Sequence, residues 1–185
     1  VASLRQIDAR ALHAQARLYA PTTAIRVRIG SFTGTPAPKD EPLASNPPAG
    51  AMIDYVLAQP ARKAVELAIY DAENRLVRRY SSADRPPNRD PAKTAYAPEW
   101  LPRASQLATT RGMHRFVWPL RYAKPGALAG SDTDIDGVWA PPGRYTVELA
   151  VDGKRLRQAL TVAPDPRVTL TDEAYAQQFA FAREI

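Results

Sequence analysis

Apolar and polar residues alternate along most of this chain, and a period of two residues is typical of β-strands with one buried face. The strongest alternation runs from Gly112 to Tyr122. The even positions of this segment are His114, Phe116, Trp118, Leu120 and Tyr122. Each aromatic side chain removes about 150–250 Å² from water when it is buried, so this face is predicted to be the centre of the core. Pro119 has no amide hydrogen to donate, which places the strand at a sheet edge or at a bulge.

Residues 141–162 predict a hairpin together with its register. Asp152-Gly153 is a favoured two-residue turn. Counted outward from this turn, the inward-facing pairs are Leu149 with Leu156, Val147 with Gln158 and Tyr145 with Leu160. On the other face Glu148 lies opposite Arg157, as an ion pair that we expect to face water. The predicted core therefore includes Phe116, Trp118, Leu120, Tyr145, Val147, Leu149, Leu156 and Leu160.

The same alternation predicts four more strands. They cover residues 25–29, 51–57, 64–70 and 75–80. Turn residues separate the strands, and no helical segments alternate with them. An all-β fold is therefore expected, as a seven-stranded β-sandwich of the immunoglobulin or fibronectin type III class.

Helical spacing is confined to the two ends of the chain. Ser3-Leu-Arg-Gln6 has the pattern of a capping box, in which Ser3 and Gln6 each satisfy a free amide. Leu4, Ile7, Ala11, Ala14 and Leu18 then follow at helical spacing. Pro21 ends this pattern. Residues 1–22 are therefore predicted to form a linker helix.

The second predicted helix lies at the other end of the chain. Thr171 is expected to cap it, with Leu170 and Tyr175 as a hydrophobic staple. The predicted organisation is thus a linker helix at 1–22, a β-sandwich domain at 23–165 and a C-terminal helical extension at 166–185.

Composition narrows the possible functions. Proline is frequent, with 18 of 185 residues, and it collects in the predicted loops and edges. The absence of cysteine excludes disulfides and thiolate chemistry. No run of about 18 apolar residues is present, so no membrane span is expected. The net charge of +6 comes from basic residues that are scattered along the chain, unlike the clustered basic surface of a nucleic-acid-binding protein.

Four segments resemble one family. They are Ser3-Leu-Arg-Gln6, Asn46-Pro-Pro-Ala-Gly-Ala51, Gly112-Met-His-Arg-Phe-Val-Trp118 and Ala140-Pro-Pro-Gly-Arg-Tyr-Thr-Val147. They are similar to the C-terminal region of bacterial exported proteins with sortilin-type or BNR-repeat β-propellers, often described as glycosyl-hydrolase-like. In that family a linker helix follows the propeller and leads into a β-sandwich similar to the immunoglobulin-like domain of the flagellar hook-capping protein. The resemblance covers most of residues 1–165.

The resemblance implies a non-catalytic accessory domain. The propeller, which would hold any hydrolase site, is not among these 185 residues, and none of the matching motifs is catalytic. The implied partner is the β-propeller domain of the same parent protein. The implied location is periplasmic or secreted.

Three aromatic residues are candidates for ligand binding. Tyr96, Trp100 and Trp139 lie in predicted loops, where aromatic rings on a β-sandwich can stack on a sugar. The chain would then be a carbohydrate-binding module. The alternative is that Trp100 and Trp139 pin their own loops to the core or to a neighbouring domain.

Alternating carboxylates are candidates for binding calcium. Asp132, Asp134 and Asp136 repeat the first half of a calcium loop. An EF-hand needs Glu at position twelve, and that position is Gly143, so the EF-hand is excluded. A looser calcium site and an ordinary acidic loop remain the two alternatives, and no other cofactor is expected.

Catalysis by this chain is the third functional hypothesis. A glycosidase needs two carboxylates about 5–10 Å apart across a cleft, and the candidate carboxylates in loops cannot be paired from sequence. The two histidines are His13, in the predicted linker helix, and His114, which is expected to be a hydrogen-bonded residue at the rim of the core. Neither accompanies a nucleophile elbow, so no catalytic residue is predicted.

Overall fold

The computed structural model is mostly β. It describes residues 2–8, 14–28, 40, 42, 47–85, 105–125 and 137–184. Within these ranges the chain forms eight strands and one α-helix, preceded by a 3₁₀ turn at Leu4–Gln6. The expectation of an all-β fold is therefore confirmed.

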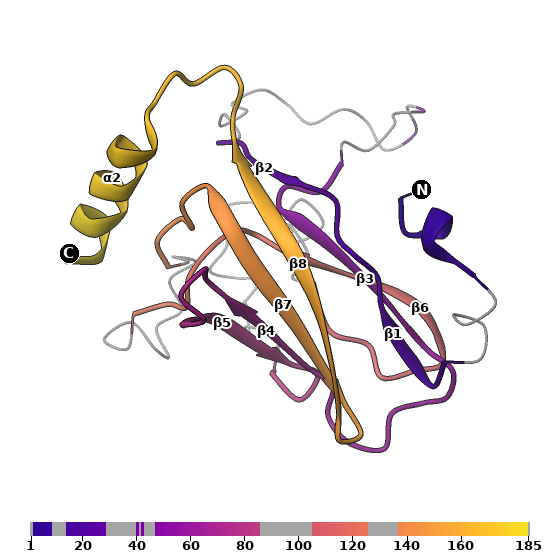
Figure 1. Cartoon of the computed structure of the whole chain (residues 1–185). Coiled ribbons are helices and arrows are strands. Elements are labelled where there is room, and N and C mark those ends of the chain that lie inside the picture. The colour runs from indigo at the N-terminus through magenta and orange to yellow at the C-terminus, as the bar shows by residue number, and fades with distance from the viewer. Residues whose placement is uncertain are drawn as a thin grey trace.

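The strands form two sheets, which Figure 1 shows as two layers. Their bounds are Ala16–Leu18 (β1), Ala24–Arg26 (β2), Ala51–Leu57 (β3), Glu66–Tyr70 (β4), Leu76–Ser81 (β5), Gly112–Trp118 (β6), Gly143–Val151 (β7) and Lys154–Pro164 (β8). The smaller layer, sheet A, has the order β1-β3-β6, and the larger, sheet B, has the order β2-β8-β7-β4-β5. All the pairings are antiparallel except that of β2 with β8, which is parallel.

The inward faces of the two sheets meet in one hydrophobic core. Trp118 of sheet A contacts Tyr145 of sheet B edge to face, with ring centroids 5.4 Å apart. Phe116 contacts Tyr80 with tilted rings, whose centroids are 4.7 Å apart. Phe116, Trp118 and Leu120 are each at most 1% exposed, which confirms their predicted burial, whereas His114 and Tyr122 at the two ends of this face are only half-buried. β6 ends at Trp118 and lies at the edge of its sheet, which agrees with the prediction from Pro119.

The hairpin of β7 and β8 has the predicted register. Leu149 pairs with Leu156, Tyr145 with Leu160 and Glu148 with Arg157. Leu156 is only partly buried, so it borders the core instead of filling it. Glu148 corrects a second expectation, because this residue of the outer face is 2% exposed under the arginines beside it.

The predicted linker helix at 1–22 is wrong for the residues that the structure describes there. They form the short turn at Leu4–Gln6 and then β1, which pairs with β3. The capping box is also absent, since the Ser3 side chain makes no cap hydrogen bond and donates to Asp54 instead. The described part of the segment is held by tertiary contacts, because the turn at Leu4–Gln6 is too short to be stable alone.

The strand count and one strand face also differ from the sequence prediction. Eight strands are described where seven were expected, because β1 lies within the predicted helix. In β2, Ala24 is buried whereas Ile25 is 48% exposed, which reverses the predicted face. The reason is register: Ala24 pairs with the buried Val162 of β8, so Ile25 points outward.

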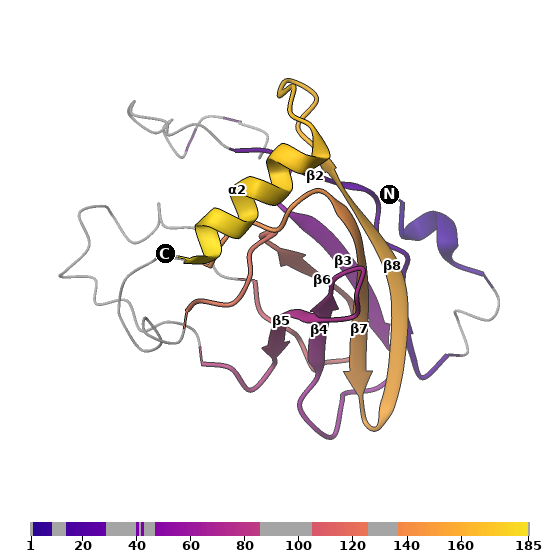
Figure 2. The same ribbon diagram turned by 60° about the vertical axis from the view of Figure 1, so that its left-hand side comes forward.

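The C-terminal helix α2 spans Asp172–Glu184. As predicted, Thr171 caps it: its Oγ1 accepts a hydrogen bond from the Ala174 amide at 3.3 Å. Tyr175 is buried, but Leu170 is 47% exposed, so the expected staple is not formed by both residues. Figures 1 and 2 show α2 set to one side of the sheets, at the end of an extended connection from β8. No described helix is long and apolar enough to cross a membrane.

Candidate functional site

Most of the residues predicted to bind a ligand lie outside the residues that the structure describes. These are Tyr96 and Trp100 of the aromatic set and Asp132, Asp134 and Asp136 of the calcium set. Trp139 is described and half-buried. Among the described residues, no group of three or more His, Cys, Asp or Glu side chains is placed to hold a metal ion.

Trp139 is stacked with arginine. The Arg121 guanidinium carbon lies 4.1 Å from the centroid of a Trp139 ring, and that of Arg26 lies at 5.5 Å. Both distances are within the range of a cation–π contact. An isolated antiparallel bridge between Arg121 and Trp139 also ties their backbones together. Trp139 is therefore linked to the chain at Arg121, and it also packs against the hydrophobic core.

The outer face of sheet A carries a buried carboxylate. Asp54 lies at an outward position of β3, directly opposite Arg115 of β6, and it is 5% exposed. Arg115 donates two hydrogen bonds to it, from Nε to Oδ1 at 2.7 Å and from a terminal nitrogen to Oδ2 at 2.8 Å. The Ser3 hydroxyl donates a third. The Asp54–Arg115 ion pair and the Ser3 hydroxyl together form the Asp54 anchor.

Two further contacts hold the N-terminal segment beside the Asp54 anchor. The Gln6 side chain bonds the backbone of Ala20 twice, accepting from its amide and donating to its carbonyl, both at 2.9 Å. Arg17 of β1 donates to the Gln6 carbonyl and to the Asp8 carboxylate, each at 2.8 Å. The Leu-Arg-Gln segment is therefore a strap tied to the outer side of sheet A.

A small cavity of about 110 Å³ lies where this strap meets the sheet. It is lined by Ala2, Ser3, Tyr19, Ala20, Pro21, Thr22, Met52, Asp54 and Arg115. Hydrogen bonds from Arg115 lower the pKa of Asp54, so the carboxyl is ionised at neutral pH. A general acid needs the opposite shift. The arrangement therefore fastens chain segments together and does not match the chemistry of a proton donor.

Several apolar side chains in β3, β6 and the strap are close in sequence or register to the Asp54 anchor. Met113 of β6 is 42% exposed, Leu4 of the strap is 56% exposed, and Ile7, which follows the strap, is 43% exposed. Met52 and Val117 face each other across β3 and β6 and are half-buried. This face therefore combines apolar side chains with the Asp54–Arg115 and Arg17–Asp8 ion pairs, a mixture that contact surfaces with other proteins also show.

The outer face of sheet B has a second buried carboxylate. Glu148 of β7 accepts hydrogen bonds from Arg155 and Arg157 of β8, each at 2.5 Å. Burial acts to raise the pKa of Glu148, and the two arginine hydrogen bonds outweigh this effect and lower it. Arg157 also lies over the Tyr70 ring, 5.7 Å from its centroid. The cluster holds β7, β8 and β4 together.

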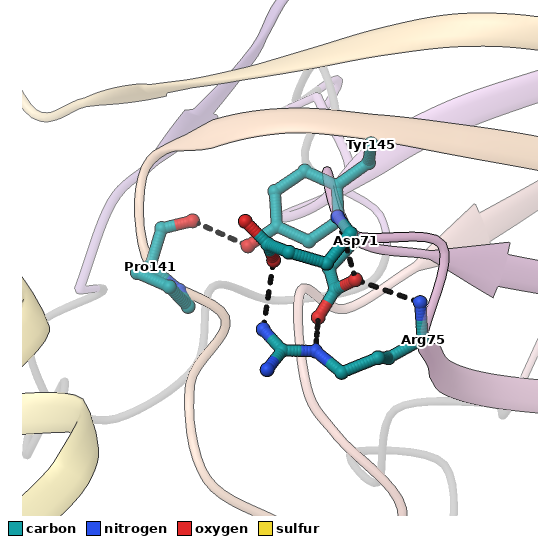
Figure 3. A network of polar contacts seen from close by, with 5 residues as sticks. Asp71, Arg75, Pro141 and Tyr145 are labelled. Carbon is teal, nitrogen blue, oxygen red and sulfur yellow. Dashed lines mark hydrogen bonds and ion pairs between the residues drawn. The ribbon is translucent and has the colours of Figure 1, made fainter.

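Two polar contacts hold the β4–β5 loop and the residues before β7 at one end of sheet B (Figure 3). In the β4–β5 loop, the Asp71 carboxylate accepts from the Arg75 amide and from Arg75 Nε, both at 2.8 Å. Close to it, the Tyr145 hydroxyl donates to the Pro141 carbonyl at 2.6 Å. Burial raises the pKa of Tyr145 well above its usual value. Both contacts are structural, since each ties a side chain to a turn.

His114 has the position expected of a rim residue. Its Nε2 lies 2.6 Å from the Thr110 carbonyl oxygen, and its ring contacts that of Tyr55 with centroids 5.3 Å apart. The Tyr55 hydroxyl in turn bonds both backbone groups of Ala108. His114 is thus part of the contact between β6 and the segment that precedes it.

Comparison with protein-family models, curated protein sequences and solved structures found no match to this chain. The site must therefore be judged from its own geometry. The Asp54 anchor was missed by the sequence analysis. Its signal is an aspartate at an outward strand position, which becomes informative only when the β3–β6 register places Arg115 opposite it.

Proposed function

We propose that this chain is a non-catalytic interaction domain with an immunoglobulin-like β-sandwich, which docks a second folded domain on the outer face of sheet A. The single observation that carries the proposal is the strap at Leu4–Gln6, pinned to that face by the Asp54 anchor and flanked by exposed apolar side chains. The proposed partner is the β-propeller domain of the same parent protein, as the sequence resemblance implies. The proposed setting is periplasmic or secreted.

The strand order supports the immunoglobulin-like topology. In that fold a G-F-C-C′ sheet packs on an A-B-E sheet. Here β8-β7-β4-β5 takes the first order and β1-β3-β6 the second, with β2 as a short parallel addition beside β8. The hydrogen bond from Tyr145 to the carbonyl four residues upstream, at the start of β7, also has the form of a tyrosine corner.

The state of the buried carboxylates supports a non-catalytic role. The buried acidic residues in the described part of the chain are Asp54, Glu148 and Asp165. Each is bonded to an arginine. Hydrogen bonds from Arg167 lower the pKa of Asp165 to about 2. These carboxylates are held ionised for structure, whereas a glycosidase raises the pKa of one carboxyl for use as its acid.

The position of the strap supports a partner that is joined before residue 1. A domain linked there would emerge beside Leu4, Ile7 and Met113, so its docking would cover the exposed apolar groups. The linkage would give the partner a high local concentration, and a modest interface would then suffice. The net charge of +6 would favour an acidic partner surface.

Hydrogen exchange tests this proposal. The parent gene product and the present chain would be compared by mass spectrometry of amide exchange. We expect slower exchange in the parent at Leu4–Gln6 and at the outer side of β6, and unchanged exchange in β8 of sheet B. Equal exchange in both proteins, or a gene product with no domain before residue 1, would contradict the proposal.

The geometry gives less support to a carbohydrate-binding module. Trp139, the one described member of the aromatic set, is half-buried and already contacts two guanidinium groups. A sugar platform needs an open ring face. Retention of the chain on a glycan array, lost in a Trp139→Ala variant, would favour this function over the interaction domain.

A further inference from the structure

The contact between α2 and the end of β2 contains an arginine with an incomplete set of partners. Arg26 is half-buried, and its guanidinium carbon lies 5.5 Å from the Trp139 ring centroid and 5.1 Å from that of Tyr175. A terminal nitrogen donates to Gln178 Oε1 at 2.9 Å. Among the described residues, no carboxylate lies within ion-pair distance of Arg26.

This pattern differs from that of three arginines that contact buried carboxylates. Arg115, Arg157 and Arg167 each bond a carboxylate directly. Arg26 instead makes one described hydrogen bond, to a neutral amide, although a guanidinium has five N–H donors. Burial lowers the pKa of Arg26, since the described contacts do not fully replace the solvation that the cation loses.

The two aromatic rings orient the guanidinium. Contacts with Trp139 and Tyr175 restrict how the Arg26 group can turn while leaving N–H donors for a planar acceptor. A carboxylate is the acceptor that matches this geometry, because it can accept two parallel hydrogen bonds from one guanidinium.

We propose that Arg26, with Trp139 and Tyr175, is a recognition site for a carboxylate of an acidic peptide segment in a partner protein, and that Gln178 of α2 occupies it in the free chain. Gln178 is exposed, so its amide can leave Arg26 without any change in the sheets. This site is formed by β2, Trp139 and α2, shares no residue with the strap and does not depend on docking at sheet A.

The test uses an acetylated, amidated tetraglutamate peptide and the matching tetraglutamine peptide, titrated into the full chain by calorimetry. Gln178→Glu supplies the missing carboxylate internally, and we expect it to weaken tetraglutamate binding at least tenfold. Gln178→Ala removes the competing amide, and we expect it to strengthen binding severalfold. Tetraglutamine is not expected to bind.

Two arginine variants provide the site-specific control. Arg26→Gln should abolish tetraglutamate binding, whereas Arg79→Gln, on the outer face of sheet B beside Glu66, should leave it unchanged. The proposal is overturned if Gln178→Glu binds as tightly as the parent, if both arginine variants bind alike, or if neither the parent nor Gln178→Ala binds. Because Gln178 is exposed on α2, its variants remain informative even if Arg26→Gln does not fold.

Discussion

Gly50 provides a sharp test of how closely β3 and β6 are fitted. It has φ +128°, and a Cβ added there would lie 2.2 Å from the carbonyl oxygen of Trp118 and 3.0 Å from its carbonyl carbon. Gly112 is a matched control, since its φ is +127° but an added Cβ would meet nothing within 4 Å. The substitutions Gly50→Ala and Gly112→Ala therefore share the backbone strain and differ in the clash.

The expected loss of stability follows from these two contributions. A residue other than glycine at this φ costs about 1–3 kcal/mol, which is our expectation for Gly112→Ala. In Gly50→Ala the buried Trp118 cannot retreat, so the start of β3 must move away and the Ala51–Trp118 pairing is lost. One or two lost backbone hydrogen bonds add about 1–3 kcal/mol.

Urea unfolding followed by circular dichroism would measure both variants. We expect the free energy of unfolding of Gly50→Ala to be about 1–3 kcal/mol below that of Gly112→Ala. Its melting temperature should be lower by several degrees, at about 2–4 °C per kcal/mol for a domain of this size. Equal losses in the two variants would refute the reasoning, because strain alone would then account for the effect.

Two further predictions concern buried ionisable groups. Tyr145→Phe leaves the Pro141 carbonyl without its partner, and we expect urea unfolding at pH 7 to show a loss of about 1–3 kcal/mol. Since the pKa of Tyr145 is raised in the folded state, the free energy of unfolding of the parent should fall above pH 10. In Tyr145→Phe it should fall by up to about 1.4 kcal/mol less per pH unit. Identical pH slopes of the unfolding free energy in the two proteins would contradict this prediction. Arg115→Gln should lower the free energy of unfolding at pH 7 by about 1–3 kcal/mol. This range is below that of a fully buried ion pair because the Arg115 side chain is 46% exposed. Because the folded pKa of Asp54 is lowered, this difference should shrink in urea titrations below about pH 4, and a constant difference down to pH 2 would contradict the ion pair.

The parts of the fold that were predicted from sequence depend on neighbours in the chain. The β7–β8 register follows from the Asp152-Gly153 turn and the alternation on either side of it, and all its predicted pairs are present. The partner of Asp54, by contrast, is 61 residues away. Alternation shows that both residues face outward, but it contains no information on which outward positions of β3 and β6 lie opposite each other.

The wrong prediction at the N-terminus has a related cause. The capping-box pattern at Ser3-Leu-Arg-Gln6 is a local signal, and an Ala-rich helix of this length is only marginally stable without tertiary packing. In the structure the same polar groups have long-range partners: Ser3 bonds Asp54, and Gln6 bonds Ala20. Residues suited to satisfying amides at a helix start are equally suited to tying a strap to a sheet.

The contacts with buried carboxylates show what several of the arginines do in this fold. Most of the 25 basic residues are arginine, and they are scattered along the chain. Arg115 and Arg167 make two-point contacts with buried aspartates, and two arginines cover Glu148. Lysine would keep the charge but has no planar fork to hold both oxygens. In the described part of the chain these arginines give each buried carboxylate a partner that leaves neither oxygen unbonded. Arg26 differs from them, since its one described hydrogen bond goes to the neutral amide of Gln178.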